Sequence, residues 1–570
     1  MSIQVNQIKG DIVELLFNPR EEDLRVGESL CLRDPVSGQG LVVQVIEFRT
    51  ASYPSLLREQ LQLVLGAGGA PLLGGEGASL ADVADSLSPR PPVGTLEETL
   101  PEAELRNLKV AVAKIRQLIQ GPGVAKATPG LRTGDLEQAY WEQWDGWIPA
   151  RDVVIERTAD AEVFANCVVS AGNPLFIGRT LHGARFEVEG RDLEKVNIIT
   201  GVKGAGKSHL AKVLLLQLIE RGAPCIVFDI NREYIHLPPH RLYPGTRKAE
   251  RRGIIHLEAG GNLRLGIQQF GLGPLSTMMA KYGLPEVSAM YFENRVARLL
   301  EEVEEARQRG RRVPFIGIDQ LIQMAEQNEF SAASDRSTLI VNGAIRSRLE
   351  ALRNTRLFAR NPAEATSLRD YYDLVREGGA LVIDISGLGN LARVGFVQAI
   401  IETIKEICEE EIASGSYRFP FVFFEEAHMY VNKSSIDYIV TRARHLGVTT
   451  FFVTNMIVAM DEVVLRQADN LFLLRLPFDD DVRHVAKSAT TDYETMSAFV
   501  RRLRGFHALL IGRVTRGYPL IVEIDRLAGI NTAGETKYFF RGRESGNQGA
   551  GKSGNQGTRE SGNQGIRGSD

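Results

Sequence analysis

A glycine-rich stretch carries the clearest chemical potential in this sequence. The segment Gly201-x-x-x-x-Gly206-Lys207-Ser208 follows a strand-like run, KVNIIT, and precedes a strongly periodic helical pattern. Glycines in such a loop let backbone N–H groups turn onto phosphate oxygens, and the start of the following helix adds a favourable dipole. The spacing and the setting are those of a phosphate-binding P-loop. They predict binding of ATP, with Lys207 neutralising the β- and γ-phosphates and Ser208 binding Mg²⁺.

The predicted nucleotide-binding residues come from this loop and the start of its helix. They are Gly201, Lys203, Gly204, Ala205, Gly206, Lys207, Ser208 and His209. The same eight-residue pattern recurs at Gly546-x-x-x-x-Gly551-Lys552-Ser553, but no strand-like run precedes that copy and no helical pattern follows it. We interpret the second copy as a coincidence of low-complexity repetition. For the first copy, the alternative is a glycine-rich turn with an exposed lysine.

Two carboxylates follow another apolar run, FPFVFF. Glu425 and Glu426 come directly after it, at the end of a strand where open α/β sheets hold ligands. One acid can hold the hydrated magnesium, and the next can orient and deprotonate the attacking water. We assign Glu425 to the metal and Glu426 to the water; the alternative is a pair of acids that favours the start of a helix. His428 fits a contact with these groups and a purely structural role equally well.

A polar strand tip gives a third set of candidates. The segment TRARHLGVTTFFVTN predicts a helix end, a turn at Gly447 and a buried strand that ends in Thr454 and Asn455. Such a tip can report the γ-phosphate. Arg442 and Arg444 lie two positions apart, about 200° around a helix, so at most one of them points into a given nucleotide pocket. Each taken alone is also compatible with a solvated surface arginine.

The elements that must position these residues form an α/β domain. Short apolar runs alternate with helical stretches from about residue 195 to 527, as a parallel sheet buried on both faces requires. A mostly helical insertion is expected at about 275–372. The first 50 residues hold short β-patterned runs that predict a small barrel or sandwich, with an insertion at about 54–134 that contains one amphipathic helix, LRNLKVAVAKIRQLIQ. The predicted domains are 1–165 and 166–542, followed by a disordered tail, 543–570, that repeats SGNQG three times.

Composition excludes several classes of protein. The chain has 570 residues, 67 basic and 71 acidic, for a net charge of −4, which excludes a wholly basic nucleic-acid coat but permits a local basic channel. Its four cysteines form no C-x-x-C pair, so neither a zinc ribbon nor a disulfide framework is indicated and a reduced compartment fits. No apolar run approaches the roughly 20 residues needed to span a bilayer, and the first residues do not have the pattern of a secretory leader. We expect a cytoplasmic protein.

With these motifs in hand, the chain resembles the HerA group of the HerA/FtsK superfamily, hexameric DNA-translocating ATPases. The resemblance extends to about Leu527. It rests on ITGVKGAGKS, FDINREY, GALVIDISGL, FFEEAH, an R-x-x-G ahead of the strand that ends in TN, and the N-terminal β-domain, which is similar to the barrel of ATP synthase subunits. It implies a RecA-like P-loop ATPase core with helices on both faces of a parallel sheet, plus an N-terminal β-barrel.

The resemblance also implies roles for particular residues. It makes Glu426 the catalytic glutamate and places Asp229 and Glu233, of FDINREY, near the nucleotide. It makes Arg444 the arginine finger that enters the neighbouring subunit's site, with Arg442 in reserve. Two positions depart from the usual pattern: Glu425 stands where P-loop ATPases often carry Asp, and Asn455 stands where this family usually has Gln. The insertion at about 54–134 has no counterpart in the family.

The expected function is translocation of double-stranded DNA by a homo-hexamer, together with a NurA-like nuclease or a defence effector docked on the barrel face. The alternative is an ATP-gated ring scaffold that activates such a partner. A conjugation or secretion ATPase is a third possibility, made less favourable by the lack of membrane-spanning runs. No base-reading motif is present, so DNA binding should be independent of sequence. Candidate DNA-binding stretches, each also explicable as a solvated surface, are Arg247, Lys248, Arg251 and Arg252, and Arg307, Arg309, Arg311 and Arg312.

Overall fold

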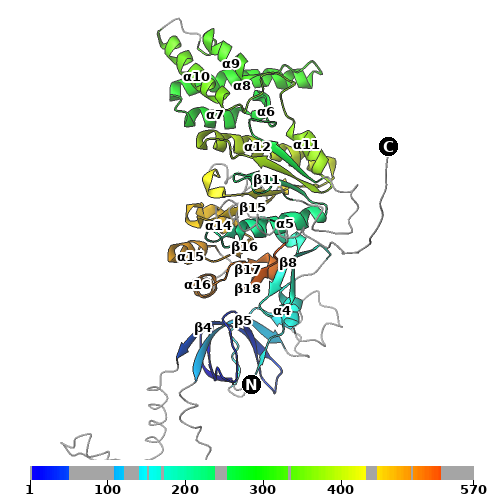
Figure 1. Cartoon of the computed structure of the whole chain (residues 1–570), viewed down its shortest axis with the longest axis vertical. Coiled ribbons are helices and arrows are strands. Elements are labelled where there is room, and N and C mark those ends of the chain that lie inside the picture. The colour runs from blue at the N-terminus through cyan, green and yellow to red at the C-terminus, as the bar shows by residue number, and fades with distance from the viewer. Residues whose placement is uncertain are drawn as a thin grey trace, which may run out of the picture.

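The molecule is elongated, with two sheets stacked along its length and a group of helices at one end (Figure 1). The computed structural model describes residues 3–50, 108–120, 140–150, 153–168, 172–235, 237, 253–331, 336–431, 446–488, 492–527 and 530. The predicted tail and most of the predicted insertion at about 54–134 lie outside these ranges. The division into domains therefore stays a prediction.

In the part of the chain that the structure describes, the N-terminal sheet has seven antiparallel strands, and it is strongly curved (Figure 1). Its path runs β1-β2-β5-β4-β3-β7, and β6 pairs with β5. The strands are β1 (Gln4–Lys9), β2 (Ile12–Phe17), β3 (Ser29–Arg33), β4 (Gly40–Thr50), β5 (Lys109–Gln120), β6 (Tyr140–Glu142) and β7 (Val154–Arg157). Alternate residues of β2, such as Val13 and Leu15, point into a core of their own. Among the described residues β1 and β7 do not pair with each other, so the sheet is a half-barrel.

The helix predicted at residues 105–120 is wrong. Residues Lys109–Gln120 form strand β5, which pairs with β2 on one side and β4 on the other. The run VAVAKI alternates in a period of two, and its buried residues are small or β-branched, which suits a central strand flanked on both sides. Part of the range assigned to an insertion therefore belongs to the first sheet.

Within the described residues, the second sheet has eleven strands in the order β12-β13-β11-β14-β15-β10-β16-β17-β18-β8-β9. The seven from β12 to β16 are parallel, and the remaining four are antiparallel. The bounds are β8 (Pro174–Thr180), β9 (Arg185–Glu189), β10 (Val196–Thr200), β11 (Pro224–Asp229), β12 (Ile254–Glu258), β13 (Gly379–Asp384), β14 (Phe421–Phe424), β15 (Thr449–Thr454), β16 (Asn470–Leu473), β17 (His507–Gly512) and β18 (Leu520–Ile524). The α/β prediction is right, but the sheet is mixed. The short connections between β8 and β9 and between β17 and β18 leave no room for a parallel crossover.

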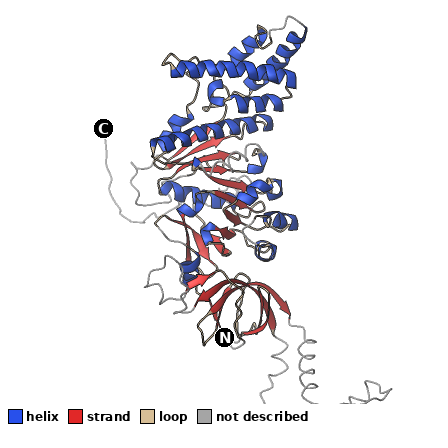
Figure 2. Cartoon of the chain, turned by 180° about the vertical axis from the view of Figure 1, so that it is seen from behind, coloured by secondary structure: helices blue, strands red, loops and turns tan. Residues whose placement is uncertain are grey.

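Helices cover both faces of the parallel part (Figure 2). Alternate strand residues divide between two cores: Ile199 and Phe423 pack with α5 (Lys207–Glu220), whereas Ile198 and Phe424 pack with α12 (Asn390–Ser414). Further helices are α4 (Asp160–Cys167), α11 (Leu368–Val375), α14 (Glu462–Gln467), α15 (Asp479–Val485) and α16 (Tyr493–Val500). Stacked rings join neighbouring strands, as between Phe423 and Phe451, whose centroids are 4.4 Å apart. Each such pair stabilises the strand alignment by about 1 kcal/mol beyond the burial of its area.

The helical group lies between β12 and β13 in the chain and at one end of the molecule (Figure 1). It consists of α6 (Ile267–Phe270), α7 (Leu272–Lys281), α8 (Glu286–Gln308), α9 (Ile318–Glu326) and α10 (Arg336–Asn354). The candidate DNA-binding arginines at its α8 end are all exposed, and Arg307 and Arg309 pair with Glu304 and Glu305 of the same helix. The other candidate stretch, residues 247–252, lies outside the described residues. No helix in the described part of the chain is long and apolar enough to cross a membrane.

Candidate nucleotide and magnesium site

Strand order brings the three predicted segments to one edge of the sheet. β10, which leads into the glycine loop, lies between β15 and β16, and β14 lies on the other side of β15. These strands are parallel, so the residues that follow β10, β14 and β15 emerge at the same edge. Ligands bind at such carboxyl ends in open α/β sheets. The loop, the two glutamates and Asn455 are thereby neighbours, although more than 200 positions separate the first from the others in the sequence.

The loop conformation requires its glycines. Gly201 and Gly206 have φ angles of 155° and 110°, which side-chain-bearing residues rarely adopt. A Cβ atom on Gly201 would lie 2.8 Å from Cβ of Leu474. Gly206 is the N-terminal cap of α5, and Lys207 is the first residue of that helix. The free N–H groups of the first helical turn therefore face the loop, as a phosphate site needs.

The side chain of Lys207 lies inside the phosphate loop. This side chain is buried, and Nζ donates a hydrogen bond to the carbonyl oxygen of Val202 at 3.2 Å. Burial lowers the pKa of Lys207, and the nearby Glu426 and Glu425 oppose that shift. A phosphate group would supply the compensating negative charge that this partly desolvated ammonium lacks.

Glu425 is held by three hydroxyl groups. Its carboxylate accepts hydrogen bonds from Ser208 Oγ at 2.7 Å and from Tyr234 Oη at 2.8 Å, one on each oxygen. Its backbone carbonyl accepts a third from Tyr430 Oη at 2.7 Å. Burial raises the pKa of Glu425 to about 7, although the bonds from Ser208 and Tyr234 oppose that shift.

Glu426 has a strained backbone and a free oxygen. Its φ and ψ of 50° and 48° place it in the left-handed region, which a glutamate adopts at a cost of about 1 kcal/mol or more. Asn455 Nδ2 donates to its Oε1 at 3.1 Å. The other oxygen, Oε2, and Asn455 Oδ1 are buried without a hydrogen-bond partner in the described part of the chain. These two atoms can accept hydrogen bonds from a bound water, which fits the roles predicted for both residues.

His428 contacts these groups. Its Nδ1 is 3.0 Å from Thr454 Oγ1 and 3.6 Å from Glu426 Oε2. Burial lowers the pKa of His428, and Glu426 opposes the shift. The contact interpretation of His428 is therefore the one that the geometry favours.

Two predicted residues turn their side chains elsewhere. The ring of His209 is 2.8 Å from the carbonyl oxygen of Asp525 and packs edge-on against Phe506. The carboxylate of Asp229 accepts backbone N–H groups of Asn231, Glu233 and Tyr234. Asp229 thus shapes the turn after β11, and a direct role of either side chain at the nucleotide stays a prediction. In the phosphate loop, Lys203 and Gly204 are exposed and Ala205 is buried.

Sequence reasoning missed two buried residues beside the site. Lys212, one turn beyond Ser208 on α5, forms an ion pair of 3.0 Å with Glu233 and is fully buried. Tyr234 is equally buried and bonds Glu425. The spacing of four between Ser208 and Lys212 places both on one helix face and was the available signal. Nothing in FDINREY singles out its tyrosine.

The donor set suits Mg²⁺. Ser208 and Glu425 present oxygen atoms, which this hard cation prefers, beside a loop made for phosphates. Within the described residues no group of three or more His, Cys, Asp or Glu side chains forms a metal cluster. Mg²⁺ does not need one, because it is typically held by one or two protein oxygens, phosphates and water. When bound with a nucleotide, the ion would supply charge neutralisation at the phosphates.

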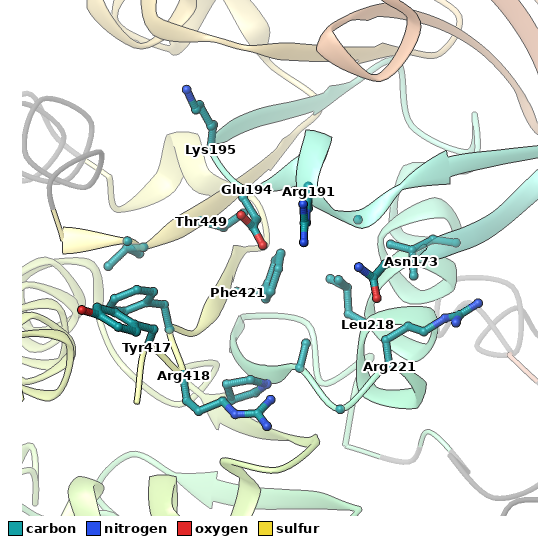
Figure 3. A pocket seen from close by; sticks show the side chains of 18 of the residues that line it. Asn173, Arg191, Glu194, Lys195, Leu218, Arg221, Tyr417, Arg418, Phe421 and Thr449 are labelled. Carbon is teal, nitrogen blue, oxygen red and sulfur yellow. The ribbon is translucent and has the colours of Figure 1, made fainter. Parts of the chain in front are cut away.

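The opposite edge of the sheet carries a separate cavity of about 580 Å³ (Figure 3). It lies at the amino ends of β10, β11, β14 and β15 and is lined by Leu218, Phe421, Gly447 and others. Among the described residues, four cations border it, namely Arg191, Lys195, Arg221 and Arg418, together with Glu194 and Asp469. Arg191 and Glu194 turn toward its centre, whereas Lys195 turns away. Arg442 and Arg444, which precede Gly447, lie outside the described residues.

One stretch of the chain matches a model of a known protein family. Residues 178–404 match the model described as the central domain of the helicase HerA. This stretch of the chain is similar to that domain. This confirms the resemblance drawn from the sequence motifs. The matched residues include the phosphate loop, the turn after β11, the helical group and β13, and they end before Glu425.

Solved structures give weaker likenesses. VirB4 of Thermoanaerobacter pseudethanolicus is 15% identical over 64% of this chain and 99% of that chain, with a TM-score of 0.48. The bacterial conjugative coupling protein TrwB is 14% identical over 66% and 94%, with a TM-score of 0.43. The genome packaging NTPase B204 of Sulfolobus turreted icosahedral virus 2 is 12% identical over 59% and 99%, with a TM-score of 0.28. A comparison with curated proteins found no match.

The raised pKa of Glu425 predicts a pH effect on stability. Between its ordinary pKa of 4.5 and about 7, Glu425 of the folded protein holds a proton that the unfolded chain releases. The stability of the nucleotide-free protein should therefore fall as pH rises through this window and level off above it. Glu425→Gln removes the titrating group. The melting temperature of the variant minus that of the wild type should increase from pH 5 to pH 8, measured in EDTA; a constant difference would contradict the burial assigned to this carboxylate.

Proposed function

We propose that this chain is an ATP-hydrolysing motor that acts as a homo-hexamer and translocates double-stranded DNA without sequence specificity. The single observation that carries the proposal is the meeting of three segments at one sheet edge: Ser208 bonded to Glu425, and Glu426 bonded to Asn455 beside Lys207. A phosphate loop, a metal-side acid, a water-side acid and a polar sensor are the parts that phosphoryl transfer to water needs. In this proposal Lys207, Ser208 and Glu425 hold ATP and Mg²⁺, and Glu426 orients the attacking water.

A ring would bring a second cation to the site. Lys207 is buried in the phosphate loop, and charge that develops on a transferred phosphoryl group is commonly stabilised by a further arginine, which a neighbouring protein can supply. We propose that Arg444 of the neighbouring subunit is this arginine. Gly447, three residues later, lines the cationic cavity on the opposite edge of the sheet. A head-to-tail ring would bring that edge of one subunit to the phosphate loop of the next.

DNA is the proposed substrate because residues 178–404 match the central domain of the helicase HerA. The solved coupling protein TrwB is described as conjugative, and VirB4 and the packaging NTPase are further likenesses. We propose that the ring channel contacts phosphates and that the N-terminal half-barrel docks a nuclease or a defence effector in the cytoplasm. The partner's identity and the pathway are not assigned.

The first test removes the phosphate-loop lysine. Lys207→Ala should lower turnover by about 100-fold or more, because a positioned charge at the phosphates is lost. ATP hydrolysis is measured with and without double-stranded DNA at several salt concentrations; DNA should stimulate the wild type, and the stimulation should decrease steeply with salt. Lys552→Ala is the matched control, since it alters the second copy of the motif and should leave turnover unchanged. DNA-independent hydrolysis by a stable monomer of 62.9 kDa would reject the proposal.

The second test asks whether two subunits build one site. Lys207→Ala and Arg444→Ala should each be inactive, but randomly mixed rings should regain about a quarter of the wild-type turnover, since a quarter of their interfaces pair an intact loop with an intact arginine. The control mixture is Lys207→Ala with Glu426→Gln, two defects within one subunit's site, which should regain none. Equal recovery in both mixtures, or an active Arg444→Ala protein, would contradict the assignment of Arg444 as an arginine finger.

A scaffold that uses ATP to order a ring is the second candidate. It is favoured by the two departures at the site, Glu425 and Asn455, each of which changes side-chain reach by one methylene. Displacement of a third strand from a DNA triplex separates the two candidates. A motor should displace it in the wild type and not in Glu426→Gln, which should still bind ATP and assemble. A wild-type ring that assembles with ATP and displaces nothing would favour the scaffold.

A further inference from the structure

The carboxylate of Glu425 is fixed from two directions. Ser208 reaches one oxygen from the phosphate-loop helix α5, and Tyr234 reaches the other from the turn after β11. The tyrosine is fully buried, so its hydroxyl has no water to exchange for this bond. The two donors hold the carboxylate in one orientation, with Oε1 turned to the phosphate loop.

The turn that carries Tyr234 is itself rigidly held. Asp229 accepts three of its backbone N–H groups at 2.9 to 3.1 Å. Glu233, the residue before the tyrosine, is tied to Lys212 of α5, whose ammonium also lies 5.3 Å from the Tyr234 ring centroid. Buried polar contacts of this kind restrict motion because every partner is satisfied in one arrangement only. The hydroxyl is therefore presented at a defined place.

A glutamate needs this support more than an aspartate does. Its longer side chain has one more rotatable bond, and fixing such a bond costs conformational entropy whenever a ligand requires one orientation. A hydrogen bond that fixes the carboxylate before the ligand arrives removes that cost from binding. Glu425 stands where an aspartate is common among P-loop ATPases, so the extra freedom is a property of this chain.

We propose that Tyr234 is a positioning residue for the magnesium site: its hydroxyl orients the Glu425 carboxylate for the cation that enters with the nucleotide. This inference rests on the proposed function, because it assumes that Ser208 and Glu425 hold Mg²⁺. Tyr234 itself touches neither nucleotide nor metal. Through the bond from Tyr234 to Glu425, the turn after β11 contributes to the magnesium site.

The test is Tyr234→Phe, which removes one oxygen atom and keeps the ring in its place. Hydrogen-bond partners of metal ligands typically change metal affinity by 10- to 100-fold when removed. Mg²⁺ should increase the affinity for a fluorescent ADP analogue, and the Mg²⁺ concentration at the midpoint of that increase should be about tenfold higher in the variant. The affinity for Mn²⁺ in the presence of ADP, measured by electron paramagnetic resonance, should fall by a similar factor. Binding of the analogue in EDTA should be unchanged.

Tyr430→Phe is the matched control. Tyr430 is also buried and bonds Glu425, but at the backbone carbonyl and not at the carboxylate. Its Mg²⁺ midpoint should stay within about twofold of the wild type, as expected for a group that is not in contact with the ligand oxygens. Equal shifts in the two variants would assign the effect to local packing and overturn the proposal, as would an unshifted or an unfolded Tyr234→Phe protein.

The wild-type protein separates this inference from the function on which it rests. If wild-type nucleotide binding shows no dependence on Mg²⁺, the magnesium site itself is wrong and both proposals fail. If wild-type binding depends on Mg²⁺ and Tyr234→Phe has the same midpoint, the proposed function stands and the positioning role alone is rejected.

Discussion

The hydrogen bond between Ser208 and Glu425 is the contact on which the rest of the site depends. It joins the first turn of α5 to the residue after β14, and it spans the edge of the sheet across β15. A bond of this length exists only if three parallel strands end level with one another, and the register of β10 with β15 and of β15 with β14 provides that. The stacked phenylalanines of β14 and β15 stabilise this alignment from both faces.

The same contact explains why a buried acid is tolerated. Glu425 is almost completely inaccessible, and an ionised carboxylate there is costly unless donors or a cation compensate it. Two hydroxyl groups are enough to keep it in place but not to hold its pKa at the ordinary value. A carboxyl group that is incompletely compensated in the free protein is suited to accept a cation. The free oxygens on Glu426 and Asn455 have the same character.

Much of this arrangement was predictable because it is local in sequence. The glycine spacing before Lys207, and the carboxylates after an apolar run, follow from chemistry that must occur at strand ends. Other parts depend on distant segments. Strand β5 was predicted as a helix because its apolar residues fit both periods, and its place between β2 and β4 decides the conformation. Tyr234 could not be singled out because its hydrogen bond to the site is with a glutamate 191 positions away. Asp229 is predicted near the nucleotide; its carboxylate accepts hydrogen bonds from the backbone of the turn after β11, and a role at the nucleotide stays a prediction.

The two edges of the large sheet have different chemistry, which gives the molecule a direction. One edge gathers glutamates, Asn455 and the phosphate loop, and the other borders a cavity that, among the described residues, is lined by four cations and two carboxylates. The half-barrel and the helical group lie at the two ends of the molecule's long axis (Figure 1). Repeated head-to-tail contacts between unlike edges close into rings when the rotation permits it, which is the geometry that the proposed motor requires.

The most direct measurement is a structure of the full-length protein with Mg²⁺ and a non-hydrolysable ATP analogue. The account predicts that the cation lies beside Ser208 and Glu425, with Tyr234 still bonded to Glu425 and an arginine of the next subunit at the terminal phosphate. A triphosphate bound elsewhere, or a cation distant from Ser208 and Glu425, would contradict it.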